Sequence, residues 1–111
     1  MKTLFHVDER QKWPLVIRNV NNFLKADAKT KIEIVANSDA VLDLLAEQNQ
    51  RQVDLDAIQK LIQRNIKICA CSNSLNRCCP NTKLISGVEP VTAGVLEITK
   101  KQSEGYAYIK P

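Results

Sequence analysis

Short apolar segments alternate along this chain with segments in which apolar residues recur every three or four positions. Residues 3–7, 31–36 and 66–71 are runs of mostly apolar side chains, which is typical of buried strands. Two shorter runs follow at residues 88–91 and 106–109. The proline in the first of these two restricts that strand to the edge or end of a sheet, because proline has no N–H to donate to a neighbour. The pattern therefore predicts five strands.

Helix signals fill the intervals between these runs. Trp13-Pro14 opens the first helix, since proline suits the first helical position. Further helices are expected from about Asp39, from near Asp54, after Ser72 and after Gly94. The apolar residues expected on the four longer helices are Val16, Val20, Phe23 and Leu24; Val41, Leu42, Leu44 and Leu45; Leu55, Ile58, Leu61 and Ile62; and Val95, Leu96, Ile98 and Thr99.

A strand followed by a helix, four times over, is typical of a parallel sheet that helices cover on both faces. Right-handed crossovers then favour an α/β fold, a three-layer α/β/α sandwich with an open, mostly parallel sheet of about five strands. A length of 111 residues suits one core of this kind and is too short for two domains. The sequence therefore predicts a single domain over residues 1–111.

Composition narrows the class of protein. Hydrophobic residues make up 44% and charged residues 25% of the chain, which excludes an intrinsically disordered protein. No apolar run approaches the roughly 20 residues that a membrane helix needs. The opening residues, MKTLFHVDER, lack the pattern of a secretory signal. We therefore expect a cytoplasmic protein with no membrane partner.

The charge is mildly positive and unevenly spread. Sixteen basic and twelve acidic residues give a net charge of +4, and residues 57–111 hold only three of the acids. A basic half attracts anions or nucleic acid. The bases are scattered, however, and five aromatic residues offer few surfaces for base stacking. A solvated basic face is favoured over nucleic-acid binding, and no glycine-rich phosphate loop is present.

Polar residues follow each of the first four predicted strands. Ligands of parallel sheets bind beyond the carboxyl ends of the strands, at a point where the strand order reverses. The segments expected to converge there are His6-Val7-Asp8, Asn37-Ser38, Cys71-Ser72-Asn73-Ser74 and Thr92-Ala93-Gly94. They bring hydroxyls, amides, backbone N–H groups and one thiol to one edge of the sheet.

Cys71 is the most informative of these residues. It ends a predicted strand and precedes a predicted helix, where unpaired N–H groups and the helix dipole would stabilise a thiolate. A cysteine with a lowered pKa serves as a nucleophile or a sulfur carrier. A buried cysteine that only packs is the alternative, and both interpretations stay open. Cys69 shares the strand face but should lie deeper, which favours a structural role.

The other candidate groups surround this thiol less directly. Cys78 and Cys79 are possible resolving cysteines for a modified Cys71, although two helical turns, roughly 10 Å, are too long for a static disulfide. The spacing C-x-C followed by C-C lacks the paired turns of zinc sites, so no metal or other cofactor is expected. His6, the only histidine, is either a proton acceptor for Cys71 or, as we favour, a half-buried ring bonded to a backbone carbonyl.

Six short motifs occur in one order along nearly the whole chain. They are Phe5–Glu9 (FHVDE), Lys12–Leu15 (KWPL), Val35–Asn37 (VAN), Cys71–Leu75 (CSNSL), Gly87–Val95 (GVEPVTAGV) and Glu104–Pro111 (EGYAYIKP). This combination resembles the DsrE/DsrF-like family, and in particular its small stand-alone members. Two features depart from the usual pattern: Ser38 stands where glycine is common, and the Cys78-Cys79-Pro80 sequence is unusual.

The resemblance implies a three-layer sandwich and a homo-oligomer, a trimer first and a hexamer second. It also implies that the cysteine at the position of Cys71 carries persulfide sulfur between a donor and an acceptor protein. Backbone amides of residues 72–74 would stabilise its anion. The alternative is a non-catalytic oligomeric module whose rim, including Asn37, Ser38, Thr92 and Gly94, binds a small molecule or an anion. Whether the protein is an enzyme stays open between these hypotheses.

Overall fold

The computed structural model describes residues 1–111 and contains one five-stranded sheet. All neighbouring strands are parallel, in the order β4-β3-β2-β1-β5. The strands are β1 (Lys2–Val7), β2 (Lys31–Ala36), β3 (Lys67–Cys71), β4 (Glu89–Val91) and β5 (Ala107–Ile109). The helices are η1 (Arg10–Lys12), α1 (Trp13–Ala26), η2 (Ser38–Leu44), α2 (Leu55–Gln63), α3 (Ser72–Cys78) and α4 (Gly94–Ser103), with η1 and η2 of the 3-10 type. The predicted α/β fold is confirmed.

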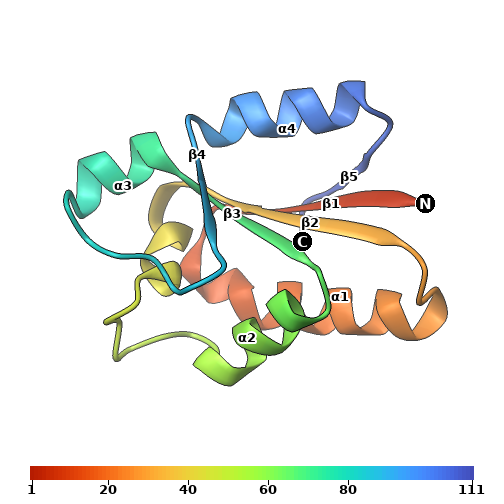
Figure 1. The fold of residues 1–111 in the computed structure, drawn as a ribbon, viewed down its shortest axis with the longest axis horizontal. Coiled ribbons are helices and arrows are strands. Elements are labelled where there is room, and N and C mark those ends of the chain that lie inside the picture. Colours follow the sequence, from red (N-terminus) through yellow and green to blue (C-terminus); the bar gives the residue numbers. More distant parts are fainter.

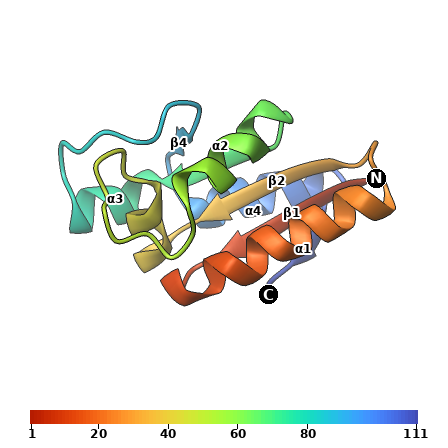
Figure 2. The same cartoon turned by 90° about the horizontal axis from the view of Figure 1, so that it is seen from below.

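The helices form two layers, one on each side of the sheet. Figure 1 shows α1 and α2 below the sheet and α4 above it. In the view from below, α1 crosses in front of β1 and β2 while α4 lies behind them (Figure 2). The chain leaves β3 into α3, which contacts η2, and leaves β4 into α4 on the opposite face. The connections after β3 and β4 therefore diverge, which makes the space between these two strand ends the switch point of the sheet.

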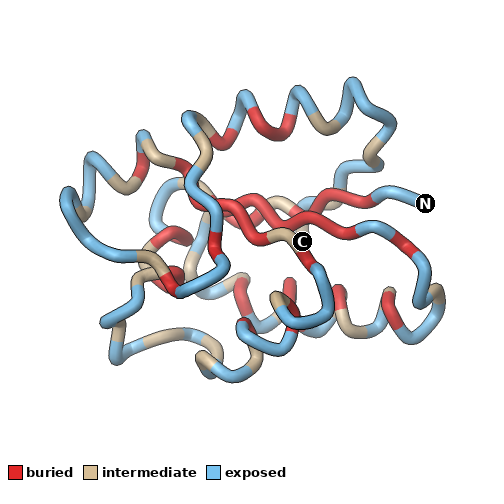
Figure 3. Tube along the Cα trace, in the orientation of Figure 1, coloured by how far each residue is buried: buried red, intermediate tan, exposed pale blue.

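The two faces of the sheet bury very different amounts of apolar surface. The three central strands, β1, β2 and β3, are buried along most of their length, whereas the edge strands β4 and β5 are not. Helices α1 and α2 turn their buried sides toward the sheet (Figure 3). On this side lies a cluster of 21 buried residues, with Trp13 donating a hydrogen bond from Nε1 to the Ala40 carbonyl at 2.9 Å. On the α4 side only four buried residues cluster, namely Leu4, Val35, Cys69 and Ile98. The hydrophobic effect therefore holds α4 much less firmly than α1.

One predicted helix was wrong in type and in its buried face. The segment from Ser38 is a 3-10 helix, in which residues three apart stack on one side. Val41 and Leu44 are buried as expected, but Leu42 and Leu45 are only half-buried. On α4, the apolar Val95 and Leu96 also point outward, with 66% and 59% exposure.

Most element ends follow the local signals. Pro90 lies in β4, an edge strand, as the sequence predicted. Asn65 and Gly105 end α2 and α4 with φ angles of 65° and 95°, in the left-handed region that these residue types tolerate. No helix in the structure is long and apolar enough to cross a bilayer.

A buried ion pair fastens η2 to the segment after β1. The Asp43 side chain is fully buried and accepts a hydrogen bond from Arg10 Nε at 2.6 Å. Its second oxygen accepts from the Gln52 backbone N–H at 2.6 Å, and its carbonyl accepts from Arg51 Nε at 3.1 Å. One carboxylate thus joins η2 to Arg10, which is 33 residues away in the sequence, and to Gln52, which is nine residues away.

Replacing Asp43 with alanine should lower the free energy of unfolding by about 3–5 kcal/mol, because it leaves Arg10 and a backbone donor without their partner. Urea denaturation monitored by tryptophan fluorescence measures this change. The matched control is Asp56→Ala, which breaks the exposed Asp56–Lys60 pair of α2 and should cost about 0.5 kcal/mol. Equal losses in the two variants would contradict the prediction.

Candidate functional site

Cys71 occupies the end of β3 at the switch point. Its side chain caps the N-terminus of α3, with Sγ accepting the N–H of Ser74 at 3.5 Å. The residue is only 5% exposed. The strand stops here because the backbone turns directly into α3, so Cys71 packs with the large core cluster and Cys69 with the small one. Cys69 is the more deeply buried of the two cysteines, 0% exposed, as the sequence predicted.

Hydrogen-bond donors converge on the Cys71 sulfur. Burial alone raises the pKa of this thiol. The Ser74 hydroxyl and the backbone N–H groups of Gly94, Ser74 and Asn73 act in the opposite direction and outweigh burial, so the pKa lies below its ordinary value. Of the three predicted backbone donors, Asn73 and Ser74 are among these groups and Ser72 is not. The Ser74 hydroxyl and the Gly94 N–H of α4 are additional donors. This arrangement stabilises a thiolate.

Ser74 has its orientation fixed from the neighbouring loop. Its buried hydroxyl oxygen accepts the backbone N–H of Ser38 at 2.8 Å, which leaves the hydroxyl proton for the Cys71 sulfur. Ser38 adopts a φ of 51°, in the left-handed region, where a serine costs about 1–2 kcal/mol relative to glycine. Glycine is common at the position of Ser38 in the family that the sequence resembles, and this backbone conformation explains why. Ser38 donates through its main chain, and its side chain is exposed.

Gly94 brings α4 against the end of β2. A Cβ added at this glycine would lie 3.0 Å from the Asn37 Cβ, closer than two side chains normally approach. Asn37 Oδ1 accepts a hydrogen bond from His6 Nε2 at 2.9 Å. The other ring nitrogen, His6 Nδ1, lies 2.6 Å from the hydroxyl of Tyr108. The sequence motif around Gly94 thus serves close packing.

His6 has other partners than those considered from the sequence. Both ring nitrogens are engaged by side chains, one by Asn37 and one by Tyr108. Neither bonds a backbone carbonyl, which corrects the interpretation that we favoured, and neither contacts the Cys71 sulfur. The missing information was the position of Tyr108, 102 residues away in the chain. His6 contacts Asn37, the residue that packs against Gly94.

The remaining candidates lie around α3 and β4. Cys78 and Cys79 form a disulfide with each other at the C-terminal end of α3, so they are not directed at Cys71. Ser72 and Cys79 lie at the two ends of a cavity of about 410 Å³ along one side of α3. Thr92 is exposed and lines a second cavity of about 260 Å³ next to the start of α4.

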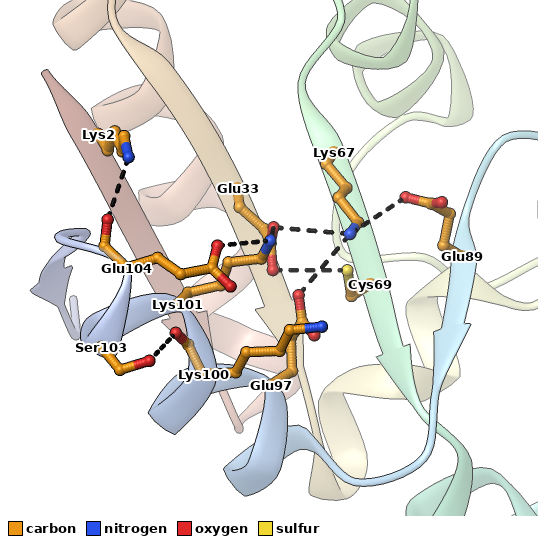
Figure 4. Close-up of polar contacts among 10 residues, drawn as sticks. All are labelled: Lys2, Glu33, Lys67, Cys69, Glu89, Glu97, Lys100, Lys101, Ser103 and Glu104. Atoms are coloured by element: carbon orange, nitrogen blue, oxygen red, sulfur yellow. Dashed lines mark hydrogen bonds and ion pairs between the residues drawn. The ribbon is translucent and has the colours of Figure 1, made fainter.

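A second polar cluster, missed by the sequence analysis, lies between the sheet and α4. Figure 4 shows Glu33 of β2, Lys67 and Cys69 of β3, and Glu97 and Lys101 of α4 pointing toward one another. Lys67 Nζ and Lys101 Nζ each lie 3.9 Å from Glu33 Oε1, and Cys69 Sγ lies 3.7 Å from Glu33 Oε2. Glu33 is 2% exposed. The sequence signal that could have revealed this cluster is a glutamate inside an otherwise apolar strand segment.

The cluster holds one carboxyl group in its neutral form. Burial, followed by a hydrogen bond and repulsion from Glu97, raises the pKa of Glu33 to about 8, while the pKa of Glu97 is lowered by its hydrogen bond with Glu33. Folded Glu33 thus binds a proton that the unfolded chain releases near pH 4.5, so this group makes the free energy of unfolding fall as pH rises from about 4.5 to about 8.

The carboxyl oxygens of Glu33 and Glu97 and the sulfur of Cys69 lie within 4.8 Å of one another, a spacing that raises the question of a metal ion. The ammonium groups of Lys67 and Lys101 already lie 3.8–3.9 Å from carboxyl oxygens of Glu33 and Glu97. Burial and the nearby Glu33 also raise the pKa of Cys69, which keeps its sulfur protonated. The chemistry of this donor set therefore fits an internal ion cluster better than a metal site.

The fold and the site define a class of protein: a parallel five-stranded α/β sandwich with a hydrogen-bonded thiol at its switch point. The sequence profile of the DsrE/DsrF-like family matches residues 1–111, and the chain belongs to this family. A protein of unknown function, MTH1491 from Methanobacterium thermoautotrophicum, is similar with 32% identity and a TM-score of 0.87, over 99% of this chain and 98% of that one.

A second solved structure supports the fold. The ychN protein from E. coli has 17% identity and a TM-score of 0.81, with 100% of both chains covered. A comparison with the curated proteins found no match.

Replacing Ser74 with alanine should raise the pKa of Cys71, because the thiolate loses the hydroxyl donor that outweighs burial together with the backbone amides. The pH dependence of iodoacetamide alkylation, followed at Cys71 by peptide mass spectrometry, measures this pKa. Ser72→Ala is the matched control, since no hydrogen bond joins the Ser72 side chain to the sulfur. A pKa unchanged in Ser74→Ala would exclude the hydroxyl as a donor.

Proposed function

We propose that this protein is a sulfur carrier in which Cys71 holds sulfane sulfur as a persulfide. The observation that carries the proposal is the convergence of one hydroxyl and three backbone N–H groups on a single, nearly buried sulfur. A cysteine that only packs has no need of such donors. Membership of a family associated with sulfur relay supports the same chemistry.

The transfer proceeds by thiol exchange and needs no additional oxidant. The Cys71 thiolate attacks the outer sulfur of a donor persulfide, the donor S–S bond breaks, and the donor leaves as a thiolate. Cys71 then carries one extra sulfur. The hydrogen-bond donors that stabilised the Cys71 thiolate now stabilise the negative charge on the terminal sulfur of the persulfide. An acceptor thiolate repeats the attack and restores Cys71. Partner proteins, one donor and one acceptor, are part of this proposal, as is a cytoplasmic location.

The other candidate residues take supporting roles in this scheme. Ser74 and the amides of Asn73 and Gly94 stabilise the anion, and Ser38 orients the Ser74 hydroxyl. His6 positions Asn37 against the start of α4. Cys78 and Cys79 would resolve the Cys71 persulfide only after reduction of their disulfide and unwinding of the last turn of α3.

Incubation with a low-molecular-weight persulfide should add one sulfur atom, about 32 Da, to the intact protein. Reduction should remove the adduct. Cys71→Ser should abolish it, whereas Cys69→Ser should retain it, because Cys69 stays a buried, protonated thiol. The Cys78→Ser/Cys79→Ser double variant shows whether the disulfide contributes to the adduct. An undiminished adduct in Cys71→Ser would rule out Cys71 as the carrier.

A binding module without sulfur chemistry is the second candidate. The observation in its favour is the pair of cavities, about 410 and 260 Å³, on either side of β4. In that case Cys71 stabilises the turn between β3 and α3, and a small anion or metabolite occupies a cavity. Persulfide loading at Cys71 discriminates between the two candidates.

We also propose that the protein works as a homo-oligomer, a trimer first and a hexamer second. Val95 and Leu96 expose apolar side chains beside the candidate site, and Tyr108 is 39% exposed on the edge strand β5. Tyrosine and large apolar residues gathered at a surface are typical of subunit contacts.

Light scattering at low micromolar concentration should give a mass several times the 12.5 kDa of one chain. Leu96→Glu should lower that mass, because a carboxylate would lose its water in an apolar contact. Lys100→Glu, one turn further along the exposed side of α4, is the control for added negative charge. A monomeric wild-type protein would contradict the proposal.

A further inference from the structure

Helix α4 is attached to the sheet mainly by polar groups. Its buried residues are Gly94, Glu97 and Ile98, whereas α1 buries five apolar side chains. Val95 and Leu96, the other large apolar residues of α4, face away from the sheet. A single buried isoleucine offers little apolar area, so the polar contacts of α4 decide how firmly the helix lies on the strands.

Those polar contacts run from α4 to β2 and β3. Glu97 Oε2 lies 3.8 Å from Lys67 Nζ, and Lys101 Nζ lies 3.9 Å from Glu33 Oε1 (Figure 4). Glu97 Oε2 is completely buried and has no hydrogen-bond donor among the ionised groups around it. A carboxyl oxygen of Glu33 lies within 4.8 Å of one of Glu97. A proton on Glu33 therefore supplies the donor that two buried carboxylates would lack.

The same helix supplies a donor to Cys71. Gly94 is the first residue of α4 and precedes Glu97 by about one turn, and the Glu97 N–H donates to the Ala93 carbonyl at 3.1 Å. Cys71 pairs with Val91 across β3 and β4, which places Gly94, three residues further on, at the same end of the sheet. The Gly94 N–H is among the hydrogen-bond donors that lower the pKa of Cys71. A displacement of Glu97 from the sheet therefore moves the Gly94 N–H as well, because one hydrogen-bonded turn connects them.

We propose that the Glu33–Glu97 contact is a positioning device for Cys71: it fastens α4 to the sheet and thereby keeps the Gly94 N–H on the Cys71 sulfur. Both glutamates are positioning residues. The proposal deepens the sulfur-carrier function by naming a control on its thiol, but it concerns the unmodified protein and holds whether or not Cys71 takes up sulfur.

The contact responds to pH because it needs the proton on Glu33. Ionisation of Glu33 places two carboxylates side by side in a buried space and loosens α4. The charged and titratable groups that face the pair are Lys67 and Cys69 from β3, Glu89 from β4, Lys100 and Lys101 from α4, Glu104 after it, and Lys2 and Tyr106 around the strand edge. The two nearest ammonium groups reduce the repulsion, and neither donates a hydrogen bond to Glu97 Oε2.

Glu97→Ala separates positioning from direct charge effects, since the two predict opposite signs. Removing a nearby negative charge favours a thiolate and would lower the pKa of Cys71. Loss of the Gly94 donor raises that pKa, and we expect a rise of about 0.5 unit or more, with about threefold slower alkylation at pH 7. Glu97→Gln, whose amide donates to Glu33, should restore the wild-type pKa. Glu89→Gln is the control that removes an exposed carboxylate paired with Lys67. An unchanged or lowered pKa in Glu97→Ala would overturn the proposal.

A second measurement does not require Glu97→Ala to fold. The NMR amide signal of Gly94 in the wild-type protein should shift with a midpoint near pH 8, the value of Glu33. Glu33→Gln keeps a neutral donor at that position and should remove this transition while leaving the pKa of Cys71 as in the wild type. A Gly94 signal that passes through pH 8 without a Glu33-dependent shift would also overturn the proposal.

Discussion

Withdrawing the Cys71 sulfur from water is the constraint on which this structure depends. A buried sulfur has a lowered pKa only if fixed donors replace the lost hydration. Here one donor comes from the hydroxyl of Ser74, two from the first turn of α3, and one from the first residue of α4. The β3–β4 switch point brings the beginnings of α3 and α4 to one sulfur, because the chain leaves these strands toward opposite faces.

The elements that form the site around Cys71 are therefore held in place by interactions of different kinds and strengths. Helix α1 and the large core hold β1, β2 and β3, and the Ser38–Ser74 hydrogen bond ties the loop after β2 to α3. On the other face, α4 has one buried isoleucine and a buried ion cluster. Apolar packing changes little with pH, whereas an ion cluster changes with every proton. Among the hydrogen-bond donors to Cys71, the Gly94 N–H is thus the one whose position we expect to change with pH.

The features that the sequence predicted correctly are those that depend on residues close together in the chain. All five strands, the edge position of Pro90 and the convergence of Cys71 and Gly94 follow from local patterns and from the rules of parallel sheets. The helix from Asp39 was misjudged: the segment is a 3-10 helix whose buried side includes Asp43, a charged residue that is paired with Arg10, 33 residues away. Periodicity contains no information about such a partner.

The same limitation explains the polar residues that were misassigned or missed. His6 was expected near a thiol or a carbonyl, yet its partners are Tyr108 and Asn37, 102 and 31 residues away. Glu33 is visible in the sequence as an acidic residue inside an apolar strand. Its role depends on Glu97, however, which lies near it only because α4 crosses β2. A charged residue in a segment predicted to be buried on both faces therefore implies a charged partner on the covering helix. For β2 that helix is α4: its Lys101 lies 3.9 Å from Glu33, while Glu97, four residues earlier on the same face of α4, pairs with Lys67 of β3.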